Sequence, residues 1–151
     1  KMAALFQMTY VGIPQIYYGD EVGLKGGRDP DCRRTFPWNW EEVDRRRGLH
    51  DYYRKIIGIR HEYSALRTGD FRTVLAEGKI YAYVREDDDD RIVVVLNNDA
   101  GARDVVLHLG PFGFADGDSL KDEIGGSVRQ VEGGIIELEL AGMTGMILVL
   151  Q

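Results

Sequence analysis

Asp29 and Arg33 are the residues whose types and spacing best suit the binding of a polar ligand. They lie four residues apart, beside Gly26, Gly27 and Pro30, in a segment without hydrophobic periodicity. A carboxylate accepts hydrogen bonds and a guanidinium donates two at once, so together they suit a hydroxyl-rich molecule. The same spacing suits an Asp–Arg ion pair that only folds the loop, and spacing alone favours that second interpretation.

Aromatic side chains gather around this pair in the sequence. Aromatic rings stack on sugar rings, but they are also good core residues, so both roles stay open. The residues concerned are Tyr17, Tyr18, Phe36, Trp38 and Trp40.

Asp20 and Glu21 are adjacent carboxylates that directly follow an apolar run closed by Gly19. Neighbouring side chains at the end of an extended strand point to opposite faces, so they do not converge on one bond as a general acid and base. We expect one of the two to fix the strand end by accepting hydrogen bonds from loop amides.

The remaining polar groups give no catalytic or metal-binding pattern. The run Asp87–Asp90 lacks the ligand spacing and central glycine of a calcium loop, which predicts a solvated hairpin tip. His50 and His61 are eleven residues apart, which is not the spacing of a helical metal site, and His108 alternates with leucines as an exposed strand residue does. Cys32 is the only cysteine, which excludes an internal disulfide and a thiolate zinc site.

Charge and hydropathy exclude two classes of partner. The net charge of −6 has the wrong sign for binding nucleic acid phosphates, and no apolar run reaches the roughly 18–20 residues of a membrane span. The chain opens at Lys1 with KMAALFQMTY, which is neither a start methionine nor a signal peptide. We therefore expect a piece of a longer protein, and its cellular compartment stays open.

The first part of the chain, residues 1–68, has the pattern of one β/α unit. After a short helix at 2–9, the apolar run 11–19 suits a strand buried in a parallel sheet, although Pro14 cannot donate to a central ladder. A loop over 20–47 follows, and an apolar stripe at helical spacing predicts a helix over 48–63.

The second part, residues 69–151, has the pattern of antiparallel β structure, in which a Greek-key β-sandwich is expected. Alternation in KIYAYVRE and IIELEL predicts strands with one buried and one wet face. The expected strands are 71–76, 80–85, 92–97, 105–109, 128–131, 135–140 and 146–150.

Several of these segments resemble the α-amylase superfamily, glycoside hydrolase family 13. GIPQIYYGDEVGL (12–24) resembles the segment at the eighth barrel strand, and GGRDPDCRRTFPW (26–38) is similar to the following loop of the cyclomaltodextrinase, neopullulanase and maltogenic amylase group. The segment 52–71 resembles the last barrel helix and its exit. VVVLNND (93–99) and the closing GMILVL resemble strands of the C-terminal sandwich.

This resemblance implies two parts and a role for five residues. Residues 1–68 would be the last β/α unit of an incomplete (β/α)8 barrel, and 69–151 the complete C-terminal β-sandwich. Asp29 and Arg33 would hydrogen-bond the glucose unit next to the cleavage-site sugar, on its non-reducing side. The roles implied for Gly19, Asp20 and Glu21 are structural, as a strand-end signature.

The resemblance also implies an activity that this chain lacks by itself. Members cleave α-1,4 glucosidic bonds with retention, and α-1,6 bonds are a further candidate, in cyclodextrins, pullulan or starch oligosaccharides. Their Asp nucleophile, Glu acid/base and second Asp lie upstream, and nothing here matches those segments. We therefore assign no catalytic residue, no metal and no cofactor, and expect no turnover from the 151-residue chain.

A non-catalytic β-sandwich module for carbohydrate binding or assembly is the alternative. Aromatic side chains aligned on the sandwich surface would favour it; Tyr81 and Tyr83 share one strand face, and residues 69–151 hold no tryptophan. Under the fragment interpretation the apolar run 11–19 lacks its neighbours, so we expect self-association or a swapped arrangement of residues 1–47.

Overall fold

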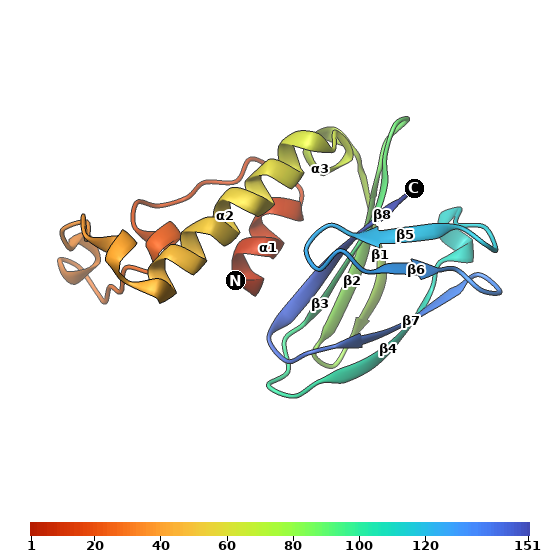
Figure 1. The fold of residues 1–151 in the computed structure, drawn as a ribbon. Coiled ribbons are helices and arrows are strands. Elements are labelled where there is room, and N and C mark those ends of the chain that lie inside the picture. Colours follow the sequence, from red (N-terminus) through yellow and green to blue (C-terminus); the bar gives the residue numbers. More distant parts are fainter.

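The computed structural model describes residues 1–151 and consists of a β-sandwich from which a helical arm projects (Figure 1). We define the arm as residues 10–62: an irregular segment with three short 3₁₀ helices, followed by the helix α2 (Asp44–Glu62) that runs back along it. Helix α1 (Met2–Thr9) precedes the arm, and the single-turn helix α3 (Ala65–Thr68) connects it to the sandwich.

All strand pairs of the sandwich are antiparallel. The large sheet has the order β1-β2-β3-β8-β5-β6, and a small sheet pairs β4 with β7. Because β8 returns to pair with β3, the connectivity is of the Greek-key kind, and the predicted mainly β fold is confirmed. The strands are β1 Asp70–Glu77, β2 Ile80–Glu86, β3 Arg91–Asn97, β4 Arg103–His108, β5 Ser119–Asp122, β6 Val128–Gln130, β7 Ile135–Leu140 and β8 Thr144–Leu150.

The central strands of the large sheet are buried on both faces, which gives the molecule two main cores. Val84 and Val93 belong to the core that includes the apolar residues of β4 and β7. Tyr83 and Val94 pack on the opposite face with residues of α1 and α3. The expectation of a wet face is therefore wrong for KIYAYVRE, because helices cover the second face of β2, and it is correct for the alternating strand β7.

The outer strands of the large sheet are irregular or short. β1 contains a bulge between Thr73 and Leu75, and most of its residues are exposed or half-buried. β6 has three residues, all of them exposed, and pairs only with β5. Regular pairing is thus concentrated in the middle of the sheet.

The strand expected at 11–19 is absent. A strand forms only when it pairs with a neighbouring strand, and no strand of this chain pairs with residues 11–19. The segment instead follows α2 without a ladder: Arg60 donates to the carbonyl of Gly12 at 2.8 Å, and Ile16 packs against the small core between α1 and α2. Ile13 is left 98% exposed.

Two further boundaries differ from the expectation. The helix expected at 48–63 begins at Asp44, because three arginines with good helix propensity extend it by a turn. Strand β5 was not predicted, because its sequence SLKD lacks an apolar alternation. It forms because Leu120 pairs with Leu150 of β8 and the buried Asp122 accepts hydrogen bonds from the amides of Ile124 and Gly125 at 3.0 and 2.7 Å.

Two buried guanidinium groups connect the helices to the sandwich. Arg85 of β2 is 1% exposed and donates to the carbonyls of Thr9 and Gly69 at 2.8 and 3.0 Å. Arg60 of α2 donates to the carbonyl of Met8 at 2.7 Å, and both arginines donate to that of Leu66, at 2.7 and 3.1 Å. Burial lowers the pKa of both groups, since no carboxylate pairs with either charge.

A hydroxyl pair adds a second link between α1 and β2. The Oγ1 of Thr9 donates to the carbonyl of Leu5 at 2.8 Å and lies 2.5 Å from the hydroxyl of Tyr83. Because the single Thr9 proton is directed to Leu5, the Tyr83 hydroxyl is the donor in the second bond. Burial raises the pKa of Tyr83.

The arginine contacts predict that Arg85→Met is strongly destabilising. The variant removes the donor for four backbone carbonyls, two of them in buried hydrogen bonds, while keeping an apolar side chain of similar length, so we expect a loss of about 3 kcal/mol in unfolding free energy. Urea denaturation followed by circular dichroism measures it. Arg129→Met, at an exposed arginine, is the control and should change the unfolding free energy by less than about 0.5 kcal/mol. A loss below about 1 kcal/mol for Arg85→Met would contradict the role given to this residue.

The tyrosines predict a loss of stability at alkaline pH. Burial and the nearby Asp122 carboxylate raise the pKa of Tyr52 to about 12. The unfolded phenol, with a pKa near 10, releases its proton first, so the stabilisation is complete below about pH 10 and is lost as pH rises towards 12. Urea denaturation at a series of pH values should show that the unfolding free energy falls less steeply above about pH 10 for Tyr52→Phe than for the parent chain. Equal slopes would argue against this assignment.

Candidate functional site

The structure brings Asp29 and Arg33 together at the far end of the arm. The Nε of Arg33 lies 3.1 Å from Oδ1 of Asp29, across a cis peptide bond to Pro30 and the short 3₁₀ helix Asp31–Arg33. Their side chains are 72% and 66% exposed. The pair is therefore an ion pair in solvent whose carboxylate and guanidinium can both be reached by a ligand.

A second acid–base pair shapes the same loop. The Nε and Nη2 of Arg34 donate to the two carboxylate oxygens of Asp31 at 2.6 and 2.9 Å, and this contact lowers the pKa of Asp31 and raises that of Arg34. The hydroxyl of Tyr18 donates to the carbonyl of Arg34 at 2.9 Å, which ties the loop to the preceding segment. The sequence reasoning missed this pair, although its spacing of three residues was a usable signal.

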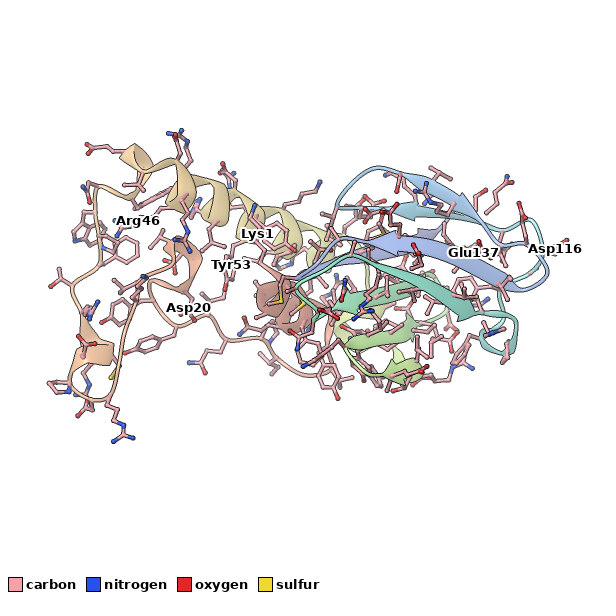
Figure 2. All side chains as sticks on the ribbon, turned by 90° about the horizontal axis from the view of Figure 1, so that it is seen from below. Lys1, Asp20, Arg46, Tyr53, Asp116 and Glu137 are labelled. Carbon is pink, nitrogen blue, oxygen red and sulfur yellow. The ribbon has the colours of Figure 1, made fainter.

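Gly19, Asp20 and Glu21 form the turn from which the loop begins. Gly19 has a φ of +93°, and a Cβ there would approach the side chain of Leu24 to 2.7 Å, so only glycine fits. Glu21 accepts a hydrogen bond from the amide of Gly19 at 2.8 Å, so this acid stabilises the turn, although no strand precedes it. Asp20 is exposed and starts a 3₁₀ helix. Figure 2 shows it across from Tyr53 of α2.

The aromatic residues of the arm are distributed over its surface. Trp38 is 82% exposed and rests edge-on against Phe36, with ring centroids 5.0 Å apart. The rings of Tyr17 and Tyr18 contact each other, with centroids 4.8 Å apart, and both are also exposed. These rings are not core residues in this structure, so stacking on a ligand remains open to them.

The acidic hairpin between β2 and β3 has a structural role. Asp87 accepts hydrogen bonds from the hydroxyl of Ser64 at 2.5 Å and from the amide of Asp90 at 2.8 Å, and the Ser64 contact lowers its pKa. Asp88 and Asp89 are exposed, as expected, whereas Asp87 and Asp90 are half-buried because they join the hairpin to α3.

Other groups add no chemistry to the arm. His108 is exposed on β4, as predicted, and Cys32 is a free thiol 3.6 Å from the Asp29 carboxylate. No group of three or more His, Cys, Asp or Glu side chains lies close enough to hold a metal ion. No helix has both the length and the apolar character needed to cross a bilayer. The pair Asp29–Arg33 is an exposed ion pair, and no second carboxylate is paired with it.

The exposure of this pair predicts that it contributes little to stability. We expect Asp29→Asn and Arg33→Gln each to change the unfolding free energy by less than about 0.5 kcal/mol in urea denaturation, since water competes for both groups. Asp122→Asn is the matched comparison: its buried carboxylate accepts amide hydrogen bonds, and its loss should cost about 2 kcal/mol. A cost above about 1 kcal/mol for Asp29→Asn would mean that the pair serves mainly to hold the fold.

The chain is similar to α-glucan-degrading enzymes over nearly its whole length. It is 41% identical over 150 residues to neopullulanase 2 of Thermoactinomyces vulgaris, covering 98% of this chain and 25% of that protein. It is 46% identical over 117 residues to a cyclomaltodextrinase of a Bacillus species, covering 74% and 21%. A solved structure of a cyclomaltodextrinase superimposes with a TM-score of 0.85 at 36% identity, covering 99% of this chain and 25% of that one.

These matches place the chain in a family, and they concern a limited part of each relative. The chain spans about a quarter or less of the length of the curated relatives it matches. A family model described as "Maltogenic Amylase, C-terminal domain" matches residues 71–147, from the start of β1 into β8. The chain therefore belongs to the maltogenic amylase C-terminal domain family, the C-terminal β-sandwich of glycoside hydrolase family 13 enzymes.

Proposed function

We propose that this chain is the C-terminal portion of a glycosidase that hydrolyses α-glucans. Its substrates would be cyclodextrins, pullulan or starch oligosaccharides, and the reaction a retaining cleavage of α-1,4 bonds, extending to α-1,6 bonds. The named relatives, a neopullulanase and a cyclomaltodextrinase, support this substrate class. In this proposal residues 1–68 are part of a catalytic barrel and 69–151 form the domain that packs on it.

The uncovered apolar surface of the arm is the observation that carries the proposal. A groove of about 620 Å³ runs between the irregular segment and α2, and its walls include Met8, Ile13, Pro14 and Ile57. An exposed apolar surface of this kind marks a site where another part of a protein packs. A (β/α)8 barrel would cover this surface by placing neighbouring strands and helices against residues 11–19.

Asp29 and Arg33 are the proposed substrate contacts. Both side chains lie on the loop that follows residues 11–19, and active sites of barrel enzymes are built from loops at this end of the strands. The carboxylate would accept a hydrogen bond from one glucose hydroxyl, while the guanidinium would donate to others. Because the ion pair is exposed, exchanging it for sugar hydroxyls costs little.

The reaction itself would be performed by residues outside this chain. Retaining hydrolysis requires two carboxyl groups about 5–5.5 Å apart on either side of the bond. Within this chain three acidic residues of the loop and its turn instead pair with arginines or fix the turn: Asp29, Asp31 and Glu21. The chain would thus contribute binding and stability, while the rest of the enzyme would contribute the nucleophile and the acid.

The alternative, a carbohydrate-binding module, has less support. Its expected feature is a row of aromatic rings on the sandwich surface. Tyr83 and Phe114 are fully buried, and Tyr81 packs against Phe6 of α1, at 6.4 Å between ring centroids. The guanidinium of Arg72 covers the ring of Phe112 at 4.9 Å. No open aromatic platform therefore remains on the sandwich.

A chimeric enzyme tests the proposal. In it, this chain replaces the corresponding C-terminal segment of the Bacillus cyclomaltodextrinase. We expect the chimera to hydrolyse cyclomaltodextrin, and Asp29→Asn or Arg33→Gln to lower kcat/KM about tenfold or more, since each removes a charge-assisted hydrogen bond to the sugar. Asp104→Asn, at an exposed position of β4, is the matched control and should leave kcat/KM unchanged.

The isolated chain provides the complementary measurement. We expect it to show no hydrolysis of cyclomaltodextrin or pullulan, and to self-associate in sedimentation velocity through the uncovered surface of the arm. Turnover by the isolated chain would contradict the absence of catalytic residues. Unchanged kcat/KM in both chimera variants would contradict the role of Asp29 and Arg33, and a strictly monomeric chain would contradict the proposed self-association.

A further inference from the structure

A second cavity lies where the arm folds onto the first turns of α2. Its volume is about 410 Å³, and it is separate from the apolar groove described above. Its apolar walls include the buried Val22 and the half-buried Leu49. No carboxylate lines it, and its four charged side chains are all basic: Lys25, Arg34, Arg45 and Arg46. We call this cavity the basic pocket.

Three of these four cations have no partner in the protein. Arg34 is bound to Asp31, whereas Lys25, Arg45 and Arg46 form no hydrogen bond or ion pair through their charged groups. The next arginine along the helix behaves differently: Arg47 pairs with Asp44 and donates to the carbonyl of Glu41 at 2.9 Å. Among the three consecutive arginines at the start of α2, the two without a partner line the cavity and the paired one does not.

The helix dipole disfavours two of these charges. Arg45 and Arg46 follow Asp44 in the first turn of a 19-residue helix, where the helix dipole is positive and cations are disfavoured. Arg46 is half-buried and lies on the side of α2 that faces the irregular segment (Figure 2). Glu41, Glu42 and Asp44 precede these arginines in the chain, but none of the three acids lines the cavity. A bound anion would remove this repulsion.

We propose that the basic pocket binds a phosphate group, either as inorganic phosphate or as the phosphate of a sugar phosphate. Phosphate carries close to two negative charges and several acceptor oxygens, which match two guanidinium groups and an ammonium group. Val22 and Leu49 form an apolar wall beside the cations, and a contact made next to apolar surface is stronger than one made in bulk water. The proposal rests on the pocket alone and does not depend on the glycosidase activity proposed above.

Calorimetric titration of the 151-residue chain at low ionic strength tests this proposal with three probes: inorganic phosphate, glucose 6-phosphate and glucose. We expect both phosphate compounds to bind and neutral glucose not to bind to this pocket. Arg46→Gln should weaken phosphate binding about tenfold, because it removes a charge-assisted contact. Lys25→Gln, on the facing loop, is a second variant that should also weaken binding, and it guards against a folding defect in the helix.

Arg54→Gln is the matched control, since Arg54 is an exposed arginine of the same helix outside the pocket. It should leave phosphate affinity unchanged. Tighter binding of glucose 6-phosphate would assign the pocket to sugar phosphates, and equal binding of both compounds would assign it to inorganic phosphate. Failure of both compounds to bind, or an equal loss of affinity in Arg54→Gln and Arg46→Gln, would overturn the proposal.

Discussion

The placement of the arm depends on two buried positive charges that are satisfied entirely by backbone carbonyls. Arg85 on the sheet and Arg60 on α2 both bond the carbonyl of Leu66, and each also bonds a carbonyl in the last turn of α1. A buried guanidinium is tolerated only when its donors find acceptors, and carbonyls at the end of a helix lack partners within that helix. The two needs are met at one junction. These shared hydrogen bonds therefore fix how α1 and the arm are placed on the sandwich.

The sequence predicts best those elements whose partners lie nearby in the chain. The strands β2, β3 and β7 follow from alternation or apolar runs, and the turns between consecutive strands follow from glycine and acidic residues. The prediction of a wet face for β2 is wrong because α1 covers Tyr83. Helix α1 lies 70 or more residues upstream of β2, and the local sequence of β2 does not indicate such a distant contact. Strand β5 forms because it pairs with β8, and its own four residues show no alternation that would predict a strand.

The same reasoning explains what was predictable at the site. Asp29 and Arg33 are close because a spacing of four residues in a tight loop brings them together. Such a contact between near neighbours in the chain can be predicted from the sequence. Residues 11–19 have the composition of a buried strand, yet strand formation requires neighbours that these residues do not find here. The basic pocket was not anticipated, since Lys25 and Arg46 meet only after the irregular segment has folded back onto α2. Contacts between distant segments depend on the tertiary fold, which composition and spacing do not describe.

The irregular borders of the large sheet have a consequence for how copies of this molecule can meet. A straight, regular border strand would act as a template on which another chain could extend the sheet without limit. The bulge in β1 interrupts such a template on one side, and on the other side β6 is too short to provide one. Open-ended growth by extension of the large sheet is therefore discouraged by the geometry of its borders. Any contact between copies would therefore be made by side chains, whose shape and charge can select the partner, and not by extension of this sheet.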